Sequence, residues 1–118
     1  MAGKHYKDLI VWQKAIELVV TIYSATKKFP QIEQYGLVSQ MRRCAVSIPS
    51  NIAEGSRRST IKDYKQFLHI AYGSGAELET QLEIAKRLSF GAQDDYNRID
   101  GLLEEVMRML NKLIATLS

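Results

Sequence analysis

The chain has 118 residues, of which 46% are hydrophobic, with only two prolines and a formal net charge of +3. This composition excludes a disordered chain, and no run of about 18 uncharged apolar residues is present to span a bilayer. The length supports one hydrophobic core and is short for two, so we expect a single domain over residues 1–118. Because no secretory signal pattern is found, we expect a cytoplasmic protein without membrane contact.

The first predicted helix covers about residues 9–27, where apolar or small residues recur at steps of three and four. This spacing places them on one face of a helix. Pro30 and Gly36 end the helix, because proline disfavours helical geometry in the preceding residue and glycine allows a turn. The second predicted helix covers about residues 37–58 and has a similar apolar periodicity.

Pro49 lies inside the second predicted helix, where a proline costs about 3 kcal/mol or more. One interpretation is a kinked helix that packs against Gly73 and Gly75 of the third helix. The alternative is a break into two short helices at residues 47–51, with a serine as the new cap.

The third predicted helix, about residues 60–89, begins at Thr60, whose hydroxyl would cap it. Its apolar residues alternate at steps of four and three. The residues SFGAQ interrupt this pattern, and the fourth predicted helix repeats it over about residues 94–117. Helices with heptad spacing and short connections are typical of antiparallel bundles. The sequence therefore predicts an all-α fold, an antiparallel up-down-up-down four-helix bundle.

The first helix carries a second apolar row beside the row expected in the core. This row is formed by Trp12, Ile16, Val19 and Tyr23. It is either part of one broad buried face or a subunit interface, because soluble monomers rarely expose large apolar patches. We take it as the candidate oligomer interface. The fourth helix also has a surplus of apolar residues, at Leu102, Met107, Met109 and Ile114.

Positive charge is concentrated in the first half of the chain. Residues 1–66 contain eleven lysines and arginines against five acidic residues, whereas residues 67–118 contain five against eight. Arg42 and Arg43 have no acidic residue three or four positions away, so they need a partner on another helix, another subunit or a ligand. The candidate nucleic-acid-binding residues are Arg42, Arg43, Arg57, Arg58, Lys62 and Lys65.

These cations form either an ordinary solvated face or a phosphate-binding surface. Aromatic residues are not interleaved with them in the sequence, so we expect any binding to be made to the backbone with little sequence readout.

Residues for catalysis or metal binding are scarce. Cys44 is the single cysteine, which excludes an intramolecular disulfide, and we expect it in the core. His5 and His69 do not share the spacing of a metal site on one helical face. The sequence has no P-loop, GxSxG or strand-linked GxGxxG motif. We therefore expect no metal, no cofactor and no enzymatic activity.

Three segments resemble a known family: LIVWQKAIEL, FPQIEQYGLVSQMRRCAVSIPSNIAEGSRRS and FLHIAYGSGAELETQLEIAKRL. They are similar to the small four-helix proteins encoded by intervening sequences of bacterial 23S ribosomal RNA genes, the S23 family. Its relatives include the accessory variability determinant of diversity-generating retroelements, a pentameric nucleic-acid-binding protein that associates with a reverse transcriptase.

The resemblance implies a homopentamer with a role around RNA or DNA and without catalysis. The arginines of the family motif correspond to Arg42, Arg43, Arg57 and Arg58. The alternative function is an oligomeric scaffold that binds a partner enzyme, such as a reverse transcriptase, without touching nucleic acid.

Overall fold

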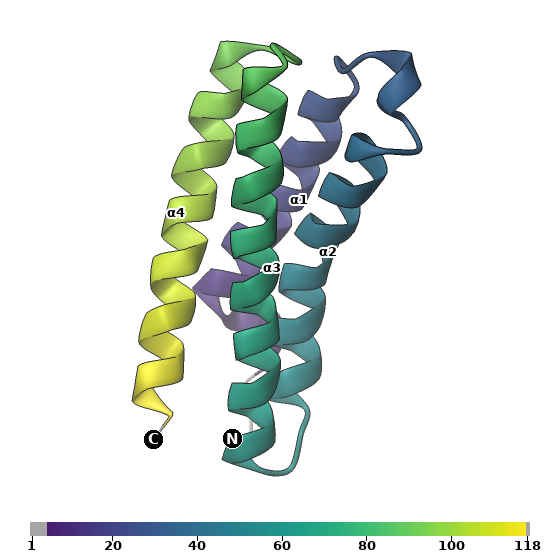
Figure 1. Ribbon diagram of the computed structural model, residues 1–118. Coiled ribbons are helices and arrows are strands. Elements are labelled where there is room, and N and C mark those ends of the chain that lie inside the picture. Colours follow the sequence, from purple (N-terminus) through teal and green to yellow (C-terminus); the bar gives the residue numbers. More distant parts are fainter. Residues whose placement is uncertain (1–4, 118) are drawn as a thin grey trace.

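The computed structural model describes residues 5–117 and shows an antiparallel up-down-up-down bundle of helices (Figure 1). The four long helices are α1 (Ile10–Thr26), α2 (Leu37–Ser56), α3 (Ile61–Arg87) and α4 (Gln93–Thr116). Two short 3-10 helices, η1 (Tyr6–Asp8) and η2 (Gln31–Glu33), precede α1 and α2. The predicted all-α fold is confirmed, and each predicted helix end lies within two residues of the observed one.

The four helices surround one core, and each helix contacts two neighbours. α1 and α3 each pack against α2 and α4, whereas the diagonal pairs have no Cα atoms within 8 Å of each other in the described residues. The bundle measures 45 × 23 × 21 Å. The turn between α2 and α3 lies at the lower end in Figure 1, together with the end of α4, whereas η2 and the α3–α4 turn lie at the upper end.

The core contains the residues that the heptad spacing places on one face of each helix. Leu18, Ile22, Ile48, Leu78 and Leu110 are fully buried, with no exposed side-chain area. Burial of a large aliphatic side chain contributes roughly 1.5 to 3 kcal/mol, so this row fixes the rotation of each helix about its axis.

Among the helices of residues 5–117, none has the length and hydrophobicity of a membrane-spanning segment.

α2 continues through the buried Pro49 as a single helix. The alternative of two short helices is therefore wrong. The expected packing of Pro49 against Gly73 and Gly75 is also wrong, because these glycines point away from α2. A Cβ atom added at Gly73 would meet no heavy atom within 4 Å, and one added at Gly75 would meet Met107 of α4.

The close approach between α2 and α3 occurs at Gly55, almost two helical turns beyond Pro49. A Cβ atom at Gly55 would lie 2.8 Å from the Cβ of Phe67 and 3.2 Å from the carbonyl oxygen of Tyr64. Glycine is required here because α3 occupies the space that a side chain would need. This contact fixes the turn between α2 and α3, where several of the candidate cations lie.

Candidate nucleic-acid interface

The six candidate cations occupy two separate places on the bundle. Arg57 and Arg58 follow α2, and Lys62 and Lys65 lie in the first turns of α3; we call these four residues the basic pole. Arg42 and Arg43 lie in the second turn of α2. The 14 positions between Arg43 and Arg57 correspond to about 21 Å along a helix, so the two groups are distinct.

The arginines of the basic pole are held by other side chains. Arg58 forms the i,i+4 ion pair expected from the sequence, with 2.7 Å between its Nη2 and Oε2 of Glu54. Its guanidinium also lies 4.7 Å from the centre of the Phe67 ring. Arg57 lies 5.3 Å from the centre of the Tyr6 ring. These contacts restrain the positions of both arginines. Both side chains are nevertheless exposed to solvent.

The lysines of the basic pole differ from its arginines. Lys62 and Lys65 have no hydrogen bond or ion pair within residues 5–117. Asp63 lies between them, and its backbone N–H donates to the hydroxyl of Thr60, which caps α3 as predicted. The lysines therefore present unpaired charges beside restrained arginines.

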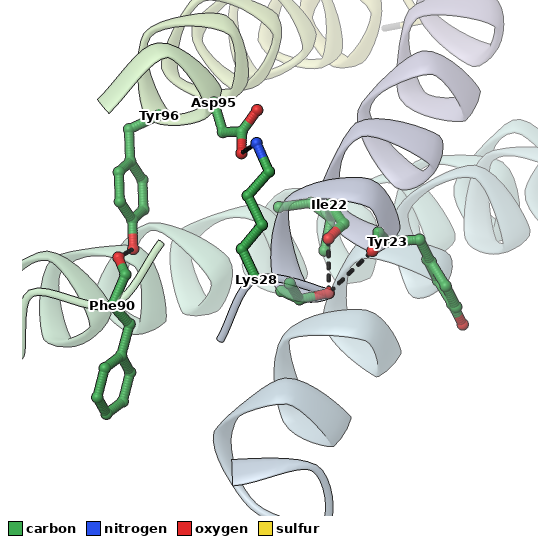
Figure 2. A network of polar contacts seen from close by, with 7 residues as sticks. Ile22, Tyr23, Lys28, Phe90, Asp95 and Tyr96 are labelled. Atoms are coloured by element: carbon green, nitrogen blue, oxygen red, sulfur yellow. Dashed lines mark hydrogen bonds and ion pairs between the residues drawn. The ribbon is translucent and has the colours of Figure 1, made fainter. Parts of the chain in front are cut away.

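Arg42 finds its partner on α1, one of the alternatives that the sequence left open. Its Nε donates to Oγ1 of Thr26 at 3.0 Å, and its Nη2 lies 3.4 Å from the carbonyl oxygen of Tyr23. The guanidinium lies 4.5 Å from the centre of the Tyr23 ring. The Thr26 hydroxyl in turn donates to the carbonyl of Ile22, and Figure 2 shows this end of α1 with the Ile22 and Tyr23 carbonyls. Arg42 is thus fixed in position.

Arg42 and Arg43 line a pocket of about 430 Å³ between α1, η2 and α2. We call it the arginine pocket, and it is lined by Tyr23, Gln34, Tyr35, Val38, Ser39, Arg42, Arg43 and Val46. No carboxylate is among these residues, and Arg43 has no ion-pair or hydrogen-bond partner in the part of the chain that the structure describes. The pocket is therefore positively charged.

Trp12, Ile16 and Val19 of the candidate oligomer interface line an apolar groove of about 260 Å³. The α1/α2 groove, as we call it, is completed by Tyr6, Val46, Pro49, Ser50 and Ala53. Sequence reasoning missed this contribution from α2, because the apolar pattern of one helix does not show which residues of another helix lie beside it. Tyr23, the fourth residue of the predicted row, lies in the arginine pocket instead. The pocket and the groove share Val46 and form one continuous face.

Sequence reasoning also missed the association of aromatic rings with the candidate arginines. Three arginine–ring pairs form in the fold: Arg42 with Tyr23, Arg57 with Tyr6, and Arg58 with Phe67. Two of the three pairs join elements distant in sequence, and no local pattern reveals them. Tyr64 also lies between Lys62 and Lys65 in the sequence, so the expectation that aromatic residues are not interleaved with the cations is wrong.

Cys44 is partly buried and packs against the core, where Nε2 of Gln81 donates to its sulfur at 3.4 Å. Burial raises the pKa of the Cys44 thiol. Within residues 5–117, no group of three or more His, Cys, Asp or Glu side chains is arranged to hold a metal ion.

We expect Cys44 to react slowly with iodoacetamide, because the thiolate is the reactive form and its fraction is reduced in the folded chain. The midpoint of the pH–rate profile, followed by mass spectrometry, should lie at higher pH for the folded chain than for the chain in urea. Comparing midpoints separates ionisation from simple shielding. A folded-state midpoint at or below that of the unfolded chain would contradict the raised pKa.

Residues 7–112 match the family model of the 23S rRNA-intervening sequence protein. The chain belongs to this family. The match includes all the residues of the basic pole, the arginine pocket and most of the α1/α2 groove. As a 23S rRNA-intervening sequence protein, the chain has the four-helix fold that the resemblance implied.

A solved structure supports the assignment to the 23S rRNA-intervening sequence protein family. It is the crystal structure of a protein of unknown function from the S23 ribosomal protein family of Bacteroides thetaiotaomicron. The two chains are 28% identical, and the superposition has a TM-score of 0.80 and covers 89% of this chain and 98% of the other. No curated protein matches the chain.

Proposed function

We propose that this intervening-sequence protein is a non-enzymatic, cytoplasmic homo-oligomer that binds RNA or DNA through the phosphate backbone. The basic pole is the observation that carries the proposal. Two unpartnered lysines lie there beside two arginines that are restrained by aromatic rings. Cations near phosphates release condensed counterions, which favours binding without reading the base sequence. The family's link to 23S rRNA intervening sequences supports a role near RNA.

The α1/α2 groove supports the homo-oligomeric part of the proposal. Ile16 and Val46 are 37% and 39% exposed, although both lie in the middle of the bundle and face the same groove. A second copy that covers the α1/α2 groove would remove these apolar side chains from water. We retain the homopentamer implied by the family resemblance as the proposed assembly.

The double variant Lys62→Gln with Lys65→Gln should weaken binding of labelled single-stranded RNA or DNA, measured by fluorescence anisotropy. Each phosphate contact contributes about 0.7 to the slope of log affinity against log salt, so the slope should fall by about 1.4. The matched control is Lys28→Gln with Lys86→Gln. These lysines lie at the upper end and pair with Asp95 and Asp100, and Figure 2 shows the first pair.

The proposal fails if the wild-type protein binds neither RNA nor DNA at about 50 mM salt, where counterion release strongly favours contact. Equal loss of slope in the control variant would mean that net charge, and not the basic pole, determines binding.

The second candidate function is an oligomeric scaffold for a partner enzyme, such as a reverse transcriptase, without direct nucleic-acid contact. The exposed apolar α1/α2 groove favours it, since such faces bind proteins. This function predicts that the unpartnered Arg43 makes a contact between subunits. Light scattering on Arg43→Ala separates the two functions. An intact oligomer with weakened nucleic-acid binding favours the first, whereas dissociation favours the scaffold.

A further inference from the structure

We propose that the arginine pocket binds single-stranded nucleic acid, with one base stacked on Tyr35 and the adjoining phosphate held by Arg42 and Arg43. The inference rests on the proposed function and adds the form of nucleic acid and the position of one nucleotide. The basic pole alone would not distinguish a single strand from a duplex, because both present phosphates.

The charges of the pocket favour a phosphate group. Two arginines line it and no carboxylate does, so a bound anion meets no repulsion from the wall. Arg42 is fixed by Thr26 and by the ring and carbonyl of Tyr23, through its Nε and Nη2 atoms. A guanidinium has five N–H donors, so others remain for a ligand. Arg43 is exposed and has no ion-pair or hydrogen-bond partner within residues 5–117, so its guanidinium is free to bind a ligand beside this fixed group.

Tyr35 supplies the surface for a base. It follows η2 at the mouth of the pocket, and its side chain is 95% exposed, which is unusual for a large aromatic residue. Aromatic rings bind successive bases of single strands by stacking, whichever base is present. The bases of a duplex are already stacked on one another and cannot lie on Tyr35. The pocket therefore selects an unpaired nucleotide.

The size of the pocket agrees with one nucleotide. Its volume of about 430 Å³ lies in the range of small-molecule sites, roughly 300 to 1,000 Å³. Ser39 and Gln34 add a hydroxyl and an amide to the wall, which donate to or accept from either a sugar or a base. An acidic protein segment would satisfy the arginines, but it lacks the flat ring that Tyr35 can cover.

The experiment measures anisotropy of labelled single strands and matched duplexes of about 16 nucleotides, at about 50 mM salt. The wild-type full chain should bind the single strand more tightly than the duplex. Tyr35→Ala should weaken binding of the single strand by about five-fold or more, with the duplex affinity unchanged, and Tyr35→Phe should retain binding. The matched control is Tyr72→Ala, which removes an exposed tyrosine of α3.

Arg43→Gln should weaken binding of the single strand in the same assay, because it removes the unpaired charge of the pocket. Both replaced side chains are exposed, and circular dichroism and light scattering check that each variant keeps its fold and assembly.

Binding that persists with equal affinity in wild type and Tyr35→Ala would overturn this inference and leave the proposed function in place. Absence of binding to single strand and duplex alike would overturn both. Displacement of the single strand by a polyglutamate peptide, with the same affinity in wild type and Tyr35→Ala, would overturn the inference and assign the pocket to an acidic protein segment.

Discussion

The double variant Ile16→Glu with Val46→Glu is expected to give a folded, helical species smaller than the wild-type assembly. Both side chains are partly exposed in the α1/α2 groove, so the core of one subunit does not depend on them. In the assembly, the variant would have to bury two carboxylates against apolar surface. Each side chain has little more than a third of its surface left to bury in the assembly, so its apolar contribution there is roughly 0.5 to 1 kcal/mol. Loss of both contributions should raise the dissociation constant by about 10-fold or more.

Sedimentation velocity and circular dichroism measure the two parts of this expectation. Val46 is preferred to Tyr23 as the second position, because Tyr23 contacts Arg42 within the same subunit. The control variant, Ile32→Glu with Ile61→Glu, adds the same charge at exposed positions outside the groove and should keep the assembly. An unfolded double variant would show that the groove belongs to the core of the subunit. An unchanged oligomer would place the interface elsewhere, for example at Met109 and Ile114 of α4.

Gly55→Ala should lower the free energy of unfolding by about 1 to 3 kcal/mol, because the added methyl group collides with α3. The neighbouring atoms are the Cβ of Phe67 and the carbonyl oxygen of Tyr64, which cannot rotate away. The helices would have to separate where α2 ends and the basic pole begins. The variant should therefore also weaken nucleic-acid binding.

Gly73→Ala is the matched control and should have the opposite effect. It also lies inside a helix, but its Cβ would meet open space, so only helix propensity changes. Alanine is favoured over glycine by about 0.8 to 1.0 kcal/mol in a helix interior. Urea unfolding of both variants at one protein concentration measures the two changes, since stability depends on concentration in an oligomer. The same sign of change in both variants would contradict the close contact at Gly55.

The sequence predicts the four helices well because the apolar periodicity within each helix identifies the face that is buried. A stripe at steps of three and four depends only on the geometry of one helix, and the observed ends of α1 and α4 lie one residue from the predicted ones. The cap at Thr60 and the ion pair of Arg58 are also local, since both partners lie within four positions.

The contacts between helices were harder to predict because they depend on how far one helix is shifted along another. The glycines of α3 illustrate this point. Gly75 packs against Met107 of α4 and not against α2. The close contact between α2 and α3 is made instead at Gly55 of α2. Prediction of the arginine pocket also requires knowing how the helices are placed along one another. Tyr35 precedes α2, Tyr23 belongs to α1, and their approach to Arg43 follows only from the packing of both helices and η2.

The hydrogen bond between the Ser47 and Ser74 hydroxyls, 2.8 Å long, sets the register between α2 and α3. A shift by one turn, about 5.4 Å, would separate this pair and also the pair of Gln81 with Cys44. Each polar group left buried and unpaired costs about 1 to 3 kcal/mol, so the two helices have one favoured alignment. The distance from Arg43 on α2 to the lysines on α3 is therefore set by uncharged side chains between the two helices. A nucleic acid that contacts both groups of cations would have to match this fixed distance.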